Sequence, residues 1–252
     1  MILCVDIKGN EIVAAEFRKK RRGLELNKFA IKPRSGSSIE TLKDDVQALF
    51  SEVGFKKGPL YITIPDTEVY FFFLEIPEIK SISRSKRRDY VLWKCKDGLP
   101  FPSEQALIDF KIFSKDKKYS RGFDENSINV VAEVSNKDII DKYISALSGY
   151  KVELIDSSTL RLANLCKANN FILLHIADSY ITLVIFQNRD LRLSRTMKTE
   201  GIINNTKVVQ FIKETMKYYQ LKNKDYVMPE SMYFYSGNLN SKLLENEVSE
   251  LT

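Results

Sequence analysis

The side chains that could do chemistry are few and dispersed along this 252-residue chain. The single histidine, His175, lies in an apolar run, where we interpret it as a packed strand residue with one satisfied nitrogen. The sequence contains no HExxH, GxSxG or Walker A motif, so the chemistries of those motifs are not indicated. The carboxylates that could form an acid/base pair are Asp6, Asp66, Asp109, Asp156 and Asp178. Of these, Asp109 and Asp156 are typical of strand ends satisfied by turns.

Composition and charge describe an ordinary globular protein. Hydrophobic residues make up 44% of the chain, which argues against disorder, and a formal charge of +6 does not by itself indicate a nucleic-acid partner. The three cysteines, Cys4, Cys95 and Cys166, are far apart, and we expect reduced, mostly buried thiols in a cytoplasmic protein. Lys8 interrupts the first apolar run, so no signal peptide is expected. No run approaches the roughly 20 apolar residues of a membrane helix.

Hydrophobic periodicity predicts a mixture of strands and helices. Short apolar or alternating runs predict strands over residues 1–7, 11–17, 24–31, 58–65, 68–77, 106–113, 127–134, 150–156, 170–176, 180–186, 190–197 and 231–237. Apolar residues at helical spacing predict helices over 39–53, 84–97, 136–148, 157–168, 204–221 and 238–250. The polar segment 115–126 is expected to be a loop.

Two basic clusters and one aromatic run each have a structural and a functional interpretation. Residues 18–23, RKKRRG, fit a solvated hairpin tip or a contact with acidic lipid or an acidic partner. Residues 84–88, RSKRR, begin a helix, where the helix dipole disfavours cations, and fit a solvated face or a similar acidic contact. Residues 70–73, YFFF, put apolar side chains on both faces of a strand, which predicts a strand covered on both sides or a partner surface.

The order of the expected elements repeats within the chain. Three strands followed by a helix and a strand occur at the start and again from residue 170. A shift of 169 residues aligns Asp6 with His175, Ile7 with Ile176 and Ile12 with Ile181. Two such halves describe the duplicated, ribonuclease H-like α/β fold of actin and Hsp70. In that fold a tight turn after the first strand of each half cradles nucleotide phosphates with backbone N–H groups.

Four stretches resemble, in order and spacing, the type IV pilus assembly protein family PilM: LCVDI, YITIPDTEVYFFFLEIP, VLWKCKDGLPFPSEQALIDFKIF and INVVAEVSNKDIIDKYISAL. They are more distantly similar to the cytoplasmic actin-like domain of the type II secretion protein GspL. The most specific pattern is matched by Pro65, Pro77, Trp93, Leu99, Pro100, Phe101, Pro102 and Asp109. The resemblance covers residues 1–200 well and the remainder loosely.

This resemblance implies an actin-like fold with an inserted 1C subdomain. The implied division places subdomain 1A at 1–32 and 127–168, the 1C-like subdomain at 33–126, and the 2A-like second half at 169–252. Because only about 34 residues separate Met197 from Met232, subdomain 2B is expected to be reduced or absent.

The positions that would hold ATP and magnesium depart from the family pattern. Residues 6–10 read Asp-Ile-Lys-Gly-Asn instead of Asp-Ile-Gly-Ser-Ser, so a lysine replaces the close backbone approach, although its ammonium could meet a phosphate. Residues 175–177 read His-Ile-Ala instead of Asp-Ile-Gly, and neutral histidine is a poor magnesium ligand. We expect no cofactor, with weak ATP binding at a degenerate site as the alternative. That site would comprise Asp6, Lys8, Gly9, Asn10, Ser236 and Gly237.

The resemblance implies a non-hydrolysing cytoplasmic scaffold, peripheral to the inner membrane, in a type IV pilus or type II secretion assembly platform. In PilM-like proteins a groove between 1A and 1C receives the N-terminal peptide of the membrane protein PilN, and the assembly ATPase is a second, direct or indirect, partner. The residues expected to frame or support the groove are Ile12, Val13, Tyr70, Trp93, Pro100 and Phe101. The alternatives are an ATP-binding actin-like ATPase and a GspL-type domain whose membrane helix follows Thr252.

The stretch GLPFP at 98–102 predicts a sharp helix end, because glycine and proline together stop a helix and fix the exit of the chain. We expect it to redirect the chain into the strand at 106–113. Trp93, on the preceding helix, is expected to pin that helix to its sheet, with a partner contact as the alternative.

Overall fold

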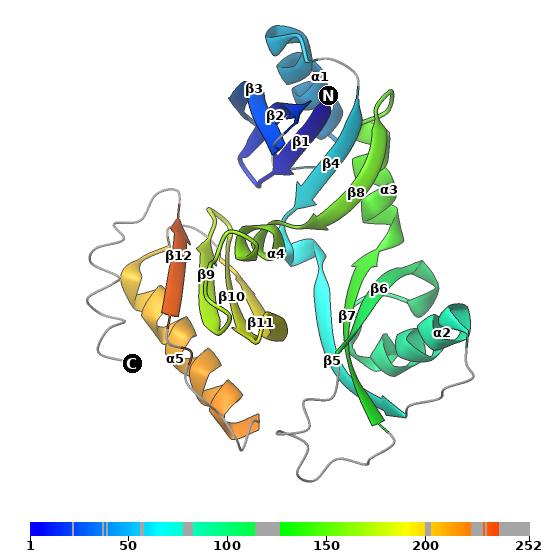
Figure 1. Ribbon diagram of the computed structural model, residues 1–252, viewed down its shortest axis with the longest axis vertical. Coiled ribbons are helices and arrows are strands. Elements are labelled where there is room, and N and C mark those ends of the chain that lie inside the picture. The colour runs from blue at the N-terminus through cyan, green and yellow to red at the C-terminus, as the bar shows by residue number, and fades with distance from the viewer. Residues whose placement is uncertain are drawn as a thin grey trace. The chain divides into compact units, whose positions relative to one another are not determined.

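The computed structural model divides into two compact units (Figure 1). Unit 1 comprises residues 1–68 and 137–165, and unit 2 comprises 69–136 and 166–252. The structure describes residues 1–21, 23–36, 38, 40–55, 58–77, 83–113, 127–199, 203–222, 229 and 231–236. The loop expected at 115–126 and the helix expected at 238–250 lie outside these described residues.

Unit 1 is built on a five-stranded sheet in the order β3-β2-β1-β4-β8. Its strands are β1 (Ile2–Ile7), β2 (Glu11–Lys20), β3 (Gly23–Pro33), β4 (Pro59–Ile64) and β8 (Lys151–Ser157). The first three strands are antiparallel, whereas β4 is parallel to β1 and β8 is parallel to β4. Alternate residues of β1, β2 and β4 are buried, which is the period-two pattern of a sheet with one closely packed face.

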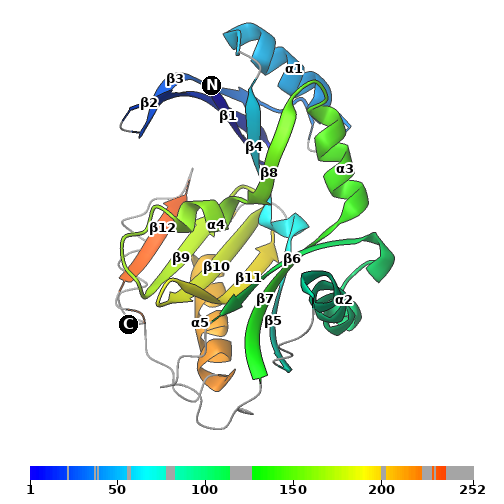
Figure 2. The same cartoon turned by 45° about the vertical axis from the view of Figure 1, so that its right-hand side comes forward.

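Helices α1 (Leu42–Val53) and α3 (Lys137–Ala146) contact each other beside this sheet (Figure 2). Helix α1 buries one stripe of side chains: Leu42, Val46, Leu49 and Phe50. It ends at Gly54, whose φ of 62° is the left-handed conformation that glycine adopts without strain. A single turn, η1 (Asp66–Glu68), follows β4, and the short α4 (Ser158–Ala163) follows β8.

The first sheet of unit 2 is antiparallel, in the order β5-β7-β6. Its strands are β5 (Tyr70–Pro77), β6 (Ala106–Phe113) and β7 (Ser127–Asn136). Helix α2 (Arg84–Cys95) packs against β5 and β6, and its first turn is capped by the Ser83 hydroxyl, which accepts from the Lys86 N–H. Burial raises the pKa of the Cys95 thiol to about 11, so this thiol stays protonated at neutral pH.

The GLPFP stretch packs against β5. Its residues Leu99–Pro102 lie between two short turns, η2 (Lys96–Gly98) and η3 (Ser103–Gln105). A Cβ added at Gly98 would lie 2.7 Å from Cε1 of Phe72, so only glycine allows this close approach to the ring. The Phe101 ring meets the Tyr70 ring edge-on, with centroids 5.7 Å apart. Helix α2 therefore ends at Cys95, two residues before the predicted end, and the GLPFP stretch redirects the chain into β6 as predicted.

Two expectations about aromatic residues were wrong. Trp93 does not pin α2 to the sheet, because it is 53% exposed and its ring lies beside that of Tyr90. The covering expected on both faces of β5 is not found at Phe73, which is 39% exposed, whereas Tyr70 and Phe72 pack toward the buried core under α2. Side-chain alternation assigned the two faces correctly but could not show which face the rest of the chain covers.

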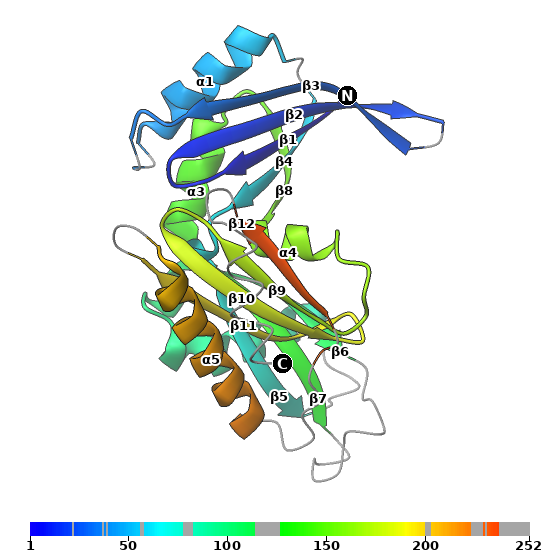
Figure 3. The same ribbon diagram turned by 90° about the vertical axis from the view of Figure 1, so that its left-hand side faces the viewer.

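The second sheet of unit 2 has the order β11-β10-β9-β12 (Figure 3). Its strands are β9 (Phe171–Ile176), β10 (Tyr180–Gln187), β11 (Asp190–Lys198) and β12 (Ser231–Ser236). Strands β9 and β10 are almost entirely buried, and α5 (Asn205–Lys222) packs against β10 and β11. The α5 face that meets the sheet carries Val208, Phe211, Ile212, Met216 and Tyr219.

The predicted duplication is confirmed in strand register. In unit 1, Asp6 pairs with Val13 and Ile7 with Ile12; in unit 2, His175 pairs with Thr182 and Ile176 with Ile181. Each pair is related to its counterpart by the predicted shift of 169 residues. In unit 1 the parallel strand β4 pairs with the other side of β1, and in unit 2 the parallel strand β12 pairs with the other side of β9. The two halves therefore share one topology.

The compact units divide the chain at residues different from those expected. Strand β4, expected in the inserted subdomain at 33–126, pairs with β1 in unit 1. Strand β7, expected in subdomain 1A, pairs with β5 and β6 in unit 2. Sequence order misled the assignment because hydrogen-bonded ladders join strands that are distant in the chain. Between the two parts of unit 1 lies the segment 69–136, which belongs to unit 2.

No helix in the described part of the chain is long and apolar enough to span a bilayer. Cys95 and Cys166 are buried and Cys4 is half-buried, so the thiols are mostly buried as expected.

We predict that Gly98→Ala lowers the free energy of unfolding by about 1–3 kcal/mol, because the new methyl group must displace the packed Phe72 ring. Gly36→Ala is the matched control, since a Cβ there meets Thr41 only at 3.4 Å, and it should change stability by less than about 0.5 kcal/mol. Calorimetric unfolding of both variants checks this. Equal stability of the Gly98 variant and the unmodified protein would contradict the packing described.

Candidate functional site

Two equivalent tight turns follow the central strands of the two halves. In unit 1 the Lys8 N–H donates to the Glu11 carbonyl at 3.0 Å, and in unit 2 the Ala177 N–H donates to the Tyr180 carbonyl at 3.0 Å. A third strand adds a further bond in each half: the Arg34 N–H donates to Asn10 O at 2.7 Å, and the Thr199 N–H to Ser179 O at 2.8 Å. The hydrogen-bond patterns of the two turns thus match as well as their strands.

The first turn holds its own lysine in an ion pair. The Lys8 ammonium lies 2.6 Å from a carboxylate oxygen of Glu11, and both side chains are mostly buried, at 20% and 32% exposure. The sequence allows Lys8 to meet a phosphate as a point charge. In the structure its charge is balanced inside the turn, so a phosphate would have to compete with Glu11.

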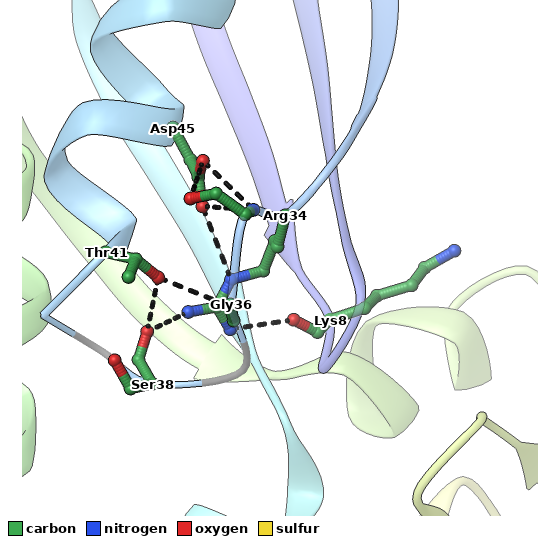
Figure 4. Close-up of polar contacts among 7 residues, drawn as sticks. Lys8, Arg34, Gly36, Ser38, Thr41 and Asp45 are labelled. Carbon is green, nitrogen blue, oxygen red and sulfur yellow. Dashed lines mark hydrogen bonds and ion pairs between the residues drawn. The ribbon is translucent and has the colours of Figure 1, made fainter.

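Arg34 ties the first turn to the segment that leads into α1 (Figure 4). Its guanidinium donates to the Lys8 carbonyl at 3.2 Å and to the Ser38 carbonyl. Its Nε lies 4.0 Å from Asp45 Oδ2, and the two side chains are only 5% and 6% exposed. The terminal nitrogens of the guanidinium thus hydrogen-bond two carbonyls, whereas its Nε faces the Asp45 carboxylate as an ion pair without a hydrogen bond.

Asp45, in the first turn of α1, organises the other side of this segment. Its carboxylate accepts from the Ser35 N–H at 3.2 Å and from the Ser35 hydroxyl at 2.7 Å. The Thr41 hydroxyl donates to the carbonyls of Gly36 and Ser38, at 3.2 and 3.0 Å. Figure 4 shows these bonds closing around one loop. The first turn is therefore braced by a buried charge pair and its hydrogen bonds.

Three of the five candidate carboxylates lie at adjacent strand ends in unit 1. Asp6 accepts from the Thr63 hydroxyl at 2.6 Å and from the Ser158 hydroxyl at 2.8 Å. Asp66, 1% exposed, accepts from both the N–H and the hydroxyl of Thr159. These carboxylates hold β1 and η1 to the start of α4.

Asp156 is the third of these carboxylates. Burial raises its pKa, an effect that the Arg161 guanidinium and the Ser157 N–H oppose and the nearby Asp66 carboxylate reinforces. The remaining two candidates lie elsewhere: Asp109 is 3.7 Å from Arg84 on the surface, and Asp178 is exposed in the second turn. Asp6, Asp66 and Asp156 are thus gathered at one sheet end, but the described contacts serve to join elements.

His175 is packed in the second sheet, as expected. It is 3% exposed, and its ring meets the rings of Tyr180 and Tyr235 at centroid distances of 5.4 Å. Ser236 ends β12 opposite Ile176, whereas Gly237 lies outside the described residues. Within the described ranges no group of three or more His, Cys, Asp or Glu side chains is arranged to hold a metal ion.

The expected partner residues fall into two groups. Ile12 is fully buried in unit 1, so it can support but not touch a partner, and Val13 lies half-buried on the opposite face of β2. In unit 2, Tyr70 and Phe101 are half-buried in ring contact, and Pro100 is exposed beside them. Trp93 is exposed, and Nζ of Lys94 lies 5.2 Å from its ring centroid. We call Tyr70, Trp93, Pro100 and Phe101 the aromatic group of unit 2; the ring contacts join Tyr70 to Phe101 and Trp93 to Tyr90.

The brace formed by Arg34 and Asp45 was not identified from the sequence. Asp45 reads as an ordinary acidic residue in the first turn of a helix, and Arg34 as a polar residue after a strand. An acidic residue near a helix start is a recognisable pattern, because its charge interacts favourably with the helix dipole. Nothing in the sequence spacing, however, pairs Asp45 with Arg34.

Comparison with known proteins identifies the fold. No protein-family model and no curated protein matches the sequence. Solved structures do match, and they define the chain as an α/β protein of the actin-like ATPase fold. It is similar to the PilM–PilN type IV pilus biogenesis complex, with a TM-score of 0.79 and 14% identity over 98% of this chain and 86% of the other.

Two further structures share this fold. One is the cytoplasmic domain of EpsL, an inner-membrane component of the type II secretion system of Vibrio cholerae, with a TM-score of 0.55 and 11% identity over 99% of this chain and 94% of the other. The other is a Bacteroides thetaiotaomicron protein of actin-like ATPase fold and unknown function, with a TM-score of 0.60 and 12% identity over 99% and 87%. The expected PilM-like fold, with GspL-type domains as more distant relatives, is confirmed.

We predict that Arg34→Gln lowers the free energy of unfolding by about 3 kcal/mol, because it leaves the buried Asp45 carboxylate without its cation. A double-mutant cycle with Asp45→Asn should show a coupling of about 1–3 kcal/mol. Lys142→Gln, which breaks the exposed pair with Glu40, is the control and should cost less than about 1 kcal/mol. Denaturant unfolding measures all four variants, and additive effects of Arg34 and Asp45 would refute the coupling.

Proposed function

We propose that this protein is a cytoplasmic actin-like scaffold, peripheral to the inner membrane, in the assembly platform of a type IV pilus or a related type II secretion machine. The observation that carries the proposal is the similarity, over nearly the whole chain, to a structure of PilM in complex with PilN. By analogy, the partner would be a short cytoplasmic peptide of a PilN-like membrane protein. An assembly ATPase would be a further partner, directly or through another subunit.

The aromatic group of unit 2 suits a short peptide. Trp93 offers a large exposed ring, and Phe101, Tyr70 and Pro100 provide rigid apolar surface whose ordering requires little additional entropy. Two cations, Lys94 and Lys96, lie within 6 Å of the Trp93 ring centroid and would favour acidic residues in the peptide. A fully buried Trp93 would not have been available for this role.

A scaffold that does not hydrolyse ATP is favoured by the contacts of the first turn. Lys8 is paired with Glu11, and the Asp6 carboxylate is engaged by two hydroxyl donors. In the second half, the position equivalent to Asp6 is the buried His175. An ATP-dependent enzyme needs these positions to bind magnesium and phosphate, and the residues present serve packing and turn closure instead.

We predict that Trp93→Ala weakens binding of the N-terminal cytoplasmic peptide of the neighbouring membrane protein by about tenfold or more, because an exposed aromatic anchor is lost. The melting temperature should stay close to that of the unmodified protein. Leu221→Ala, at a leucine that is 76% exposed on α5, is the matched control and should bind normally. Calorimetric titration measures both. Loss of stability with unchanged peptide affinity would refute the binding role.

The alternative of an ATP-binding ATPase is tested separately. We predict that titration with ATP and magnesium gives no binding in the micromolar range, because the Lys8 and Asp6 side chains already have protein partners. Micromolar binding that Asp6→Ala abolishes would establish the ATPase alternative. The Glu11→Gln variant removes the partner of Lys8 and tests whether that ion pair blocks nucleotide. It should bind nucleotide no more weakly than the unmodified protein.

A GspL-type domain is the second alternative, and the EpsL similarity supports it.

A further inference from the structure

The tip of the β2–β3 hairpin is a ribbon only two strands wide. β1 pairs with β2 no further than the Ile2–Phe17 pair, whereas β2 and β3 continue to pair from Phe17–Leu26 out to Lys20–Gly23. Figure 3 shows this dark blue hairpin extending past the beginning of β1. The ribbon lies at the edge of its sheet, since β3 is the first strand in the sheet order.

One face of the hairpin is an exposed apolar row. Its members are each more than half exposed: Leu24 57%, Leu26 54%, Phe29 55% and Ile31 54%. Their partners across the ladder are Lys19, Phe17, Ala15 and Val13. The opposite face is the one that α1 approaches, because the Lys28 ammonium donates to the Val53 carbonyl at 3.0 Å. Four such residues in one row are unusual for a surface that meets only water.

The same ribbon ends in consecutive cations. Arg18, Lys19, Lys20 and Arg21 are all exposed, and Lys20 pairs with Glu25 at 3.1 Å on the surface. Adjacent like charges repel one another, so this cluster does not stabilise the hairpin. Large apolar side chains on one face, bordered by Lys and Arg, make the amphipathic pattern of segments that lie at a membrane interface.

We propose that the β2–β3 hairpin binds the surface of a bilayer that contains anionic lipids. The apolar row would meet the boundary between headgroups and acyl chains, and the cations would meet the headgroups. A bilayer supplies negative charge over a wide area, which suits four cations on a protruding tip. A second copy paired along the β3 edge fits less well, because parallel pairing would bring the two cation clusters together and antiparallel pairing would bring each cluster beside Lys32. A second copy packed on the apolar row itself is an outcome of the experiment below.

This inference deepens the proposed scaffold function but rests on different residues. Peptide binding is assigned to unit 2, and the lipid contact to unit 1. Vesicle binding is measured without any peptide and peptide binding without vesicles, so the failure of one proposal can be told from failure of the other.

The experiment is co-sedimentation of the full chain with large vesicles. One set contains phosphatidylcholine with about 30% phosphatidylglycerol, and the other contains phosphatidylcholine alone, in about 100 mM salt. We expect partitioning to the anionic vesicles to be at least about tenfold stronger. Each cation near an anionic surface strengthens membrane binding roughly fivefold. The triple variant Lys19→Gln, Lys20→Gln, Arg21→Gln should therefore bind the anionic vesicles at least about tenfold more weakly.

Matched variants separate this site from general attraction. Arg84→Gln, Lys86→Gln, Arg88→Gln removes the same charge from the exposed cluster at the start of α2 and should retain most binding. For the apolar row, the double variant Leu24→Ser, Leu26→Ser should partition to the anionic vesicles about tenfold more weakly than the unmodified protein. The control is the double variant Leu165→Ser, Leu221→Ser, at two leucines that are each 76% exposed, and it should bind the vesicles as well as the unmodified protein.

Three results would overturn the proposal. The first is no preference for anionic vesicles, and the second is an equal loss in the α2 charge variant. The third is a dimer in sedimentation equilibrium that the Leu24 and Leu26 pair of substitutions dissociates while vesicle binding is absent, which would assign the row to a second copy.

Discussion

The pairing of β1 with strands on both of its sides is the constraint on which the rest of unit 1 depends. Antiparallel pairing with β2 places the turn at residues 8–11, and parallel pairing with β4 places Thr63 beside Asp6. A one-residue slip would turn Leu3, Val5 and Ile7 out of the core, so burial fixes the register. The same arrangement around β9 in unit 2 produces a second turn with the same hydrogen bonds. Both candidate phosphate turns of the actin-like fold are therefore formed by backbone pairing, whatever side chains they carry.

The side chains then decide how each turn is used. In the first turn, Lys8 and Glu11 neutralise each other, and Arg34 and Asp45 brace the loop from a buried position. In the second half, His175 occupies the place equivalent to Asp6 and packs between two tyrosine rings. The side chains at these positions therefore contact other residues of the same chain. The parts of the surface for which we propose partners are the aromatic group of unit 2 and the exposed row on β3, and both have cations beside them.

Much of the fold could be predicted from sequence, but the grouping of its parts could not. The strand at 106–113 was predicted with the bounds later observed, and the helix was predicted to start at Arg84, where it does, because alternation and the Ser83 cap are local signals. The 169-residue shift held because register follows the same local pattern. The placement of β4 and β7 was wrong, since strand partners are chosen by long-range hydrogen bonding. The PilM-like partner and the loss of ATP use remain proposals that rest on the resemblance and the turn contacts.

By itself, the sequence determined most of the described elements and the duplicated register, because both are encoded in hydrophobic period and turn residues over short spans, and its resemblance to PilM implied the actin-like fold. Only the tertiary structure decided which side chains are exposed. It placed Trp93 in solvent and Ile12 in the core, and it joined Arg34 to Asp45 across a loop. Exposure and charge pairing depend on what packs from elsewhere in the chain. No window of sequence contains that information.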